Sequence, residues 1–151
     1  MSAPGHRRRE ADIQREGTLT IFVPGRLTNP MNGPHGHWST RAKWAREWRQ
    51  RTGAAILHHV AQHRAGRQLG PYGERLGVVL GEAMHVSFLL HTWNAVDSDA
   101  LGPMVKPCRD ALIDMRLIHS DAPDSGHVFE YAQVVNRKAR GVTITITPRT
   151  P

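Results

Sequence analysis

Four segments of the chain have the apolar pattern of β-strands. Residues 142–147 alternate strictly between valine or isoleucine and threonine, the pattern of a strand with one buried face. Residues 84–93 and 127–136 alternate in a similar way. Residues 18–23 are rich in β-branched and aromatic side chains and lie between a glycine and a proline. The sequence therefore predicts four strands.

Two further stretches predict helices between these strands. The first can be capped by Ser39 or Thr40 and runs to about Arg64, with apolar residues recurring on one face. The second covers about residues 104–115 and has Pro107 in its first turn, where the missing N–H costs little. The order strand, helix, strand, helix, strand, strand predicts an α+β fold: a single domain with about four strands and two main helices.

The remaining segments predict loops and one arm. Residues 1–16 are polar and charged without periodicity, so we expect a flexible basic N-terminal arm before a folded domain at 17–151. Glycine and proline predict loops at 25–38 and at 66–81, the latter with a short extended piece at 78–80.

The aromatic and histidine residues of the first helix predict packing rather than chemistry. Trp44 and Trp48 lie one turn apart, a spacing more typical of core packing than of platforms for DNA bases. His58, His59 and His63 have no third ligand or acid near them in the sequence, so we interpret them as solvated helix residues rather than a metal site.

Composition narrows the class of protein. Of 151 residues, 39% are hydrophobic and 22% charged, which is typical of a globular domain with a sizeable core. The single cysteine, Cys108, excludes an internal disulfide and fits a reducing cytosol. No apolar run approaches the ~20 residues of a membrane span. No apolar signal region follows Arg7–Arg9. We therefore expect a cytoplasmic protein without a membrane partner.

The net charge of +7 is unevenly distributed. Residues 1–75 hold 13 Lys and Arg against 5 Asp and Glu, whereas residues 76–151 hold 7 against 8. Such asymmetry suggests a phosphate-binding half and a separate acidic patch, although a merely soluble basic surface explains the composition equally well. We expect DNA contacts from one loop residue and from basic residues of the first helix. These are Asn32, Arg41, Lys43, Arg46, Arg49 and Arg51.

The acidic patch lies between Asp97 and Asp121. Asp97 and Asp99 directly follow the apolar segment 84–93, and Asp121 follows the second helix. Divalent cations such as Mg²⁺ bind carboxylate oxygens, so acids from two loops suit a metal site. The structural alternative is that Asp97 turns the chain and Asp99 caps the helix. Lys106 lies early enough in the helix to contact a phosphate.

These residues resemble the RusA family of four-way (Holliday) junction resolvases, small endonucleases common in bacteriophages and prophages. The family pattern is Asp-x-Asp-Asn-Leu, a Lys, x-x-x-Asp-Ala-Leu, and a late Asp-Asp pair. The matching residues here are Asp97-Ser98-Asp99-Ala100-Leu101, Lys106 to Leu112, and Ser120-Asp121. The resemblance extends more weakly over residues 18–147, through Ile21 to Gly25, Asn29 to Asn32 and Arg140 to Ile144.

The resemblance implies a mixed sheet and a hydrolase for DNA recombination and repair. It implies that Asp97, Asp99 and Asp121 are the catalytic, metal-binding acids, that Lys106 assists, and that Asp110 supports the site. The cofactor would be Mg²⁺, with Mn²⁺ as a possible substitute. The substrate would be branched DNA, and its two-fold symmetry favours a homodimer in the bacterial host cytoplasm. The threonine-alternating strand or the other apolar strands could form the dimer contact.

Three departures from the family pattern leave other functions open. Ala100 replaces the usual Asn, Ser120 replaces the first acid of the late pair, and the spacer before Lys106 is longer than usual. One alternative is a non-catalytic branched-DNA-binding module with a degenerate metal site. Another is a nuclease for other branched or single-stranded DNA.

Overall fold

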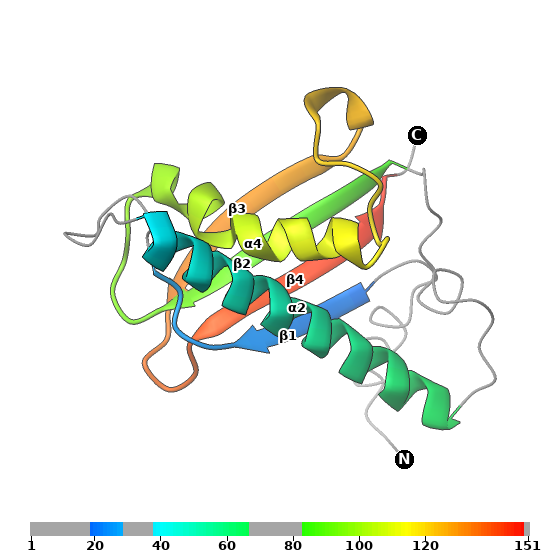
Figure 1. Ribbon diagram of the computed structural model, residues 1–151, viewed down its shortest axis with the longest axis horizontal. Coiled ribbons are helices and arrows are strands. Elements are labelled where there is room, and N and C mark those ends of the chain that lie inside the picture. Colours follow the sequence, from blue (N-terminus) through cyan, green and yellow to red (C-terminus); the bar gives the residue numbers. More distant parts are fainter. Residues whose placement is uncertain (1–18, 29–37, 67–82, 150–151) are drawn as a thin grey trace, which may run out of the picture.

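The four predicted strands pair into one mixed sheet in the computed structural model, which describes residues 19–28, 38–66 and 83–149 (Figure 1). The strands are β1 (Leu19–Pro24), β2 (Met84–Thr92), β3 (Val128–Val135) and β4 (Gly141–Pro148), and their order across the sheet is β1-β4-β2-β3. β4 pairs antiparallel with β1 and β2, whereas β2 and β3 are parallel. The predicted α+β class is confirmed.

Two helices cover one face of this sheet (Figure 1). α2 (Trp38–Gly66) comes between β1 and β2 in the sequence, and α4 (Leu101–Asp114) connects β2 to β3. A parallel strand pair requires such a crossover. Two short 3₁₀ turns flank α4 in the sequence, η1 (Ser98–Ala100) and η2 (Pro123–Ser125). None of the helices in the described ranges is long and apolar enough to cross a membrane.

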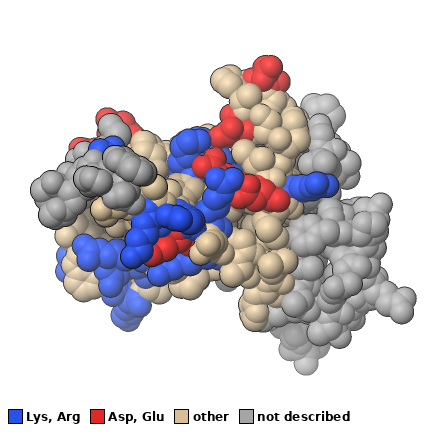
Figure 2. All heavy atoms as spheres, viewed as in Figure 1, with Lys and Arg blue, Asp and Glu red and all other residues tan. Residues whose placement is uncertain are grey.

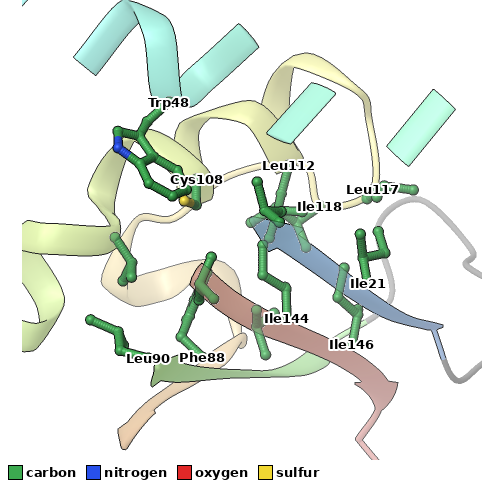
Figure 3. Packing of buried hydrophobic residues seen from close by; sticks show 14 of the residues in the cluster. Ile21, Trp48, Phe88, Leu90, Cys108, Leu112, Leu117, Ile118, Ile144 and Ile146 are labelled. Atoms are coloured by element: carbon green, nitrogen blue, oxygen red, sulfur yellow. The ribbon is translucent and has the colours of Figure 1, made fainter. Parts of the chain in front are cut away.

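The core lies between the helices and the sheet. The alternating apolar residues of β2 and β4 all face the helices and are fully buried: Met84, Val86, Phe88, Leu90, Val142, Ile144 and Ile146. From above, α2 contributes Trp48, and α4 contributes Cys108 and Leu112 (Figure 3). Trp44 packs against this cluster. The prediction that both tryptophans pack in the core is confirmed.

Both helices begin earlier than expected. α4 starts at Leu101 rather than near Met104, so Pro107 lies inside the helix and not in its first turn. The early start is possible because a proline is also tolerated near a helix N-terminus, and Pro103 occupies that place. α2 starts at Trp38, so neither Ser39 nor Thr40 is its N-cap.

Several predictions concern residues that lie outside the ranges described by the structure. The expected arm at 1–16, Asn32, and most of the loop at 66–81 lie there. Within the sheet, β4 lies between β1 and β2 and pairs with both. In the described part of the chain it therefore has no free edge, so a dimer contact through a strand edge would use β1 or β3.

Gly141 is the first residue of β4 and is paired with Pro24 of β1. Only glycine fits at this position. Its φ is +155°, and a Cβ there would lie 2.3 Å from the carbonyl oxygen of Val23 and 2.8 Å from the Phe22 ring. Gly53, inside α2, has room for a methyl group, because a Cβ would lie 3.8 Å from the Met115 sulfur.

We predict opposite effects of alanine at these two glycines. Gly141→Ala should lower the free energy of unfolding by roughly 2 kcal/mol because of the backbone clash and the strained φ. Gly53→Ala should raise it by about 1 kcal/mol through improved helix propensity. Urea denaturation measures both values. Equal stability of Gly141→Ala and the wild type would contradict the described pairing of β1 with β4.

Candidate functional site

Both parallel strands end at the same edge of the sheet, where β4 begins and β1 ends. Thr92 of β2 is paired with Val135 of β3, and Gly141 of β4 is paired with Pro24 of β1. Polar and aromatic residues follow these strand ends. We call this set the strand-end surface: Arg26, Trp93, Asn94, Arg137, Lys138 and Arg140. Binding sites in sheets with parallel strands commonly lie beyond the strands' carboxyl ends.

The loop that carries Asp97 and Asp99 leaves β2 at this same edge, and we call it the acidic loop. The Gln133 side chain of β3 fixes its backbone, accepting a hydrogen bond from the Val96 N–H at 2.9 Å and donating one to the Val96 carbonyl at 2.7 Å. Asp97 then begins η1, and Asp99 lies within it. One glutamine thus fixes where the chain delivers both carboxylates.

Neither Asp97 nor Asp99 caps a helix through its side chain. Asp97 is the N-cap of η1 but makes no side-chain capping hydrogen bond, and the N-cap of α4 is Ala100, which has no capping side chain. Both acids are exposed. Their side chains make no hydrogen bond or ion pair with any residue that the structure describes. The capping role considered from the sequence is therefore absent.

The pair fits the donor chemistry of Mg²⁺, which usually takes one or two carboxylates together with waters and phosphate oxygens. Among residues 19–28, 38–66 and 83–149, no group of three or more His, Cys, Asp or Glu side chains is arranged to hold a metal ion.

Asp121 is instead held by cations of α4. Its Oδ2 lies 3.6 Å from the Lys106 Nζ and 3.2 Å from the Arg109 Nε, and Lys106 also lies 3.4 Å from the Oδ1 of Asp110. The structure thus brings together Lys106, Asp110 and Asp121, three of the residues that the sequence suggested for one site, but not with Asp97 and Asp99 as the predicted metal site requires. The contacts among them are ion pairs. In the described chain, Asp121 does not form a group with Asp97 and Asp99 that could hold a metal ion.

Arg109 is a member of this cluster that the sequence analysis did not identify. Its Nη1 donates a 2.6 Å hydrogen bond to the Tyr131 hydroxyl, and its guanidinium lies 5.2 Å from the centre of the Phe129 ring. The Nε of Arg109 makes no hydrogen bond, so its contact with Asp121 is an ion pair. The available signal was its place one helical turn after Lys106.

The basic residues of α2 differ in what they contact. Lys and Arg side chains gather on the helical face, interspersed with acids (Figure 2). Lys43 and Arg46 are exposed there, as is Arg41. Arg49 forms a two-pronged ion pair with Asp114, with 2.6 Å between Nη2 and Oδ1, and Arg51 lies 5.5 Å from the Trp48 ring centre.

Asp114 is therefore an exposed residue with a partner, Arg49. The hydrogen bond from Arg49 lowers the pKa of Asp114. Both side chains are more than 40% exposed, so the pair contributes little to stability. The ion pair nevertheless neutralises the positive charge of Arg49, so Arg49 is a poor contact for a DNA phosphate.

The strand-end arginines and Trp93 were also missed from the sequence. The run Arg137-Lys138-Ala139-Arg140 indicates a turn, and its charge was the only sign of another role. Cys108, by contrast, is inert: burial raises the pKa of its thiol to about 11, so it stays protonated at neutral pH.

No protein-family model and no curated protein matches this chain. The likeness to RusA resolvases therefore rests on the motif residues alone and stays a hypothesis.

A buried histidine, His127, contacts the exposed His119 beyond the far end of α4. His127 accepts a 2.9 Å hydrogen bond at Nδ1 from the Met84 N–H, and its Nε2 lies 3.1 Å from the Nδ1 of His119. Burial, and secondarily the charge of His119, lowers the pKa of His127. A neutral His127 is thus part of the folded state.

We predict that this histidine makes the protein less stable in mild acid. Because the folded pKa lies below the ordinary 6.5, the unfolded chain takes up the proton first. The stabilisation is complete above pH 6.5 and is lost as the pH falls below it. His127→Asn keeps an acceptor for the Met84 N–H but cannot titrate. The stability gap between wild type and variant, measured by urea denaturation, should shrink between pH 7.5 and 5.5. A constant gap would contradict the assignment.

Proposed function

We propose that this chain is a Mg²⁺-dependent, structure-specific endodeoxyribonuclease that resolves four-way (Holliday) DNA junctions by paired phosphodiester hydrolysis. The observation that carries the proposal is the pair Asp97 and Asp99. Both carboxylates are exposed in the loop that follows β2, and neither side chain makes a capping hydrogen bond. The same loop contributes Val96 to a cavity that Arg26 and Arg140 also line. In a chain of net charge +7, acids without a partner in the described residues, on a loop that reaches arginines, suit a site that binds a polyanion through a cation.

The roles of the residues follow from their chemistry. Asp97 and Asp99 would hold Mg²⁺, or Mn²⁺ in its place. When bound, the metal supplies an activated water and neutralises charge on the phosphate. Arg137 and Arg140 would hold the DNA backbone close to the acidic loop. Lys106 would contact phosphate oxygens, and its ion pairs with Asp110 and Asp121 keep it on the exposed side of α4.

Asp121 has a conditional role in this proposal. As a third metal ligand, it would have to exchange its contacts with Lys106 and Arg109 for the cation. DNA phosphates compete for the same two cationic side chains, so substrate binding favours that exchange. The RusA resemblance supports this role for Asp121, and Asp110 would remain paired with Lys106.

The substrate's symmetry supports the proposed oligomeric state. A four-way junction must be cut in two opposed strands, which suits an isologous homodimer with one site per subunit. The expected place of action is the cytoplasm of a bacterial host, in recombination and repair of bacteriophage or prophage DNA.

A non-catalytic branched-DNA-binding module is the second candidate. It is favoured by one observation: the carboxylate of Asp121 is already neutralised by Lys106 and Arg109. Ala100 and Ser120, which replace residues of the family motif, point the same way.

Replacing Asp99 by Asn distinguishes these candidates. The change removes one negative charge and keeps the shape, so cleavage of a labelled four-way junction in Mg²⁺ should fall by orders of magnitude. Junction binding, measured by gel shift in EDTA, should persist or tighten because a repelling charge is lost. Asp97→Asn should behave in the same way.

The matched control is Asp124→Asn, an exposed acid in η2. It should leave cleavage unchanged. Undiminished cleavage by both Asp97→Asn and Asp99→Asn would refute the proposed site. Tight junction binding by a wild type that never cleaves would favour the non-catalytic module.

The basic face of α2 gives an independent prediction about DNA binding. Replacing Lys43 and Arg46 together by Ala should make the dependence of log K on log salt shallower by about 1 to 2, because each phosphate contact contributes about 0.9. Replacing Arg49 and Asp114 together leaves the net charge unchanged and removes an already neutralised pair. That control should keep the wild-type slope in fluorescence anisotropy titrations. Identical slopes for all three proteins would place the DNA contacts elsewhere.

A further inference from the structure

A cavity of about 460 Å³ opens at the strand-end surface. Its lining includes Arg26 after β1, His91 and Thr92 at the end of β2, Trp93 and Asn94 beyond it, and Arg140 before β4. Cavities of this size hold small molecules or single nucleotides. The fold defines its walls, because the backbone N–H of Gly25 donates a 3.1 Å hydrogen bond to the Arg140 carbonyl and so joins two of the segments.

Trp93 is an exposed aromatic residue held in place by arginines. Its side chain is 48% exposed, and the guanidinium carbons of Arg137 and Arg140 lie 5.2 and 5.6 Å from its ring centre. Arg137 is itself fixed by 3.4 Å hydrogen bonds to the Trp93 carbonyl and the Asn94 side chain. Aromatic rings and the arginine guanidinium groups over them together form platforms on which unpaired nucleic-acid bases stack.

We propose that this cavity binds one unpaired nucleotide of a DNA strand, with its base on Trp93 and its phosphate between Arg26 and Arg140. A nucleotide has the two properties that the lining calls for: an aromatic face and a negative charge. The inference deepens the proposed function and rests on it, because Val96 lines the cavity and Asp97 is the next residue. A strand anchored here would pass the acidic loop.

Two probes of equal charge test the proposal with the full-length protein. One is an eight-nucleotide single strand of DNA, and the other is the same backbone with abasic sites throughout. Binding is measured by fluorescence anisotropy in EDTA, where no cleavage occurs. The wild type should bind the strand with bases about tenfold more tightly, since stacking on an aromatic side chain contributes a factor of that order.

Variants separate stacking from charge. Trp93→Ala should abolish the preference for bases, and Trp93→Phe should retain part of it. Arg26→Ala with Arg140→Ala should weaken binding of both probes by similar factors. Leu57→Ala, at a 55% exposed position on α2, should change neither affinity.

Other results overturn either the nucleotide site or the function on which it rests. Equal wild-type affinity for the two probes would mean that the cavity region binds backbone phosphate only. A base preference that survives in Trp93→Ala, with wild-type folding verified by circular dichroism, would assign the stacking to another residue. A base preference in a protein that never cuts junctions in Mg²⁺ would refute the proposed function and leave the nucleotide site standing. Junction cleavage without a base preference would do the reverse.

Discussion

The parallel pairing of β2 with β3 determines where the functional groups of this protein lie. Parallel neighbours need a crossover, and α4 supplies it by packing its apolar side on the sheet. The same pairing brings the ends of both strands to one edge. There the Gln133 side chain of β3 holds the backbone of Val96, one residue before the first acid of the loop. The position of Asp97 thus depends on a strand that follows it in the sequence by more than thirty residues.

Electrostatics divides the acids of the C-terminal half into two kinds. Asp114 is paired with Arg49, Asp110 with Lys106, and Asp121 with Lys106 and Arg109. In the described chain, Asp97 and Asp99 have no such partner. A carboxylate already paired with cations loses that attraction when it binds a metal, whereas an unpaired and exposed carboxylate does not. The acidic loop after β2 is therefore the stronger metal-binding candidate, and the proposed part of Asp121 depends on what the substrate does to its partners.

The sequence predicts the strands well because their burial alternates. Met84 to Leu90 and Val142 to Ile146 place every second side chain in the core, and no tertiary knowledge is needed to see this. The predicted start of α4 was wrong because Gly102 and Pro103 suggest a loop, although both residues are tolerated in the first turn of a helix. The acids were found from their spacing. The contact of Asp121 with Arg109 could not be found in this way, because only the fold brings the two residues together. The cavity at Trp93 could not be found either, because it is built from the ends of three strands that are distant in sequence.

A metal-dependent nuclease for branched DNA that uses the carboxylates after β2 must require a divalent cation. The most direct test incubates the wild-type protein with an end-labelled four-way junction, in Mg²⁺ and in excess EDTA, and resolves the strands on a denaturing gel. We expect paired cuts in two opposed strands with Mg²⁺ and none in EDTA. Cleavage that proceeds equally in EDTA, or a junction that stays intact in Mg²⁺ and Mn²⁺ while fully bound, would contradict it.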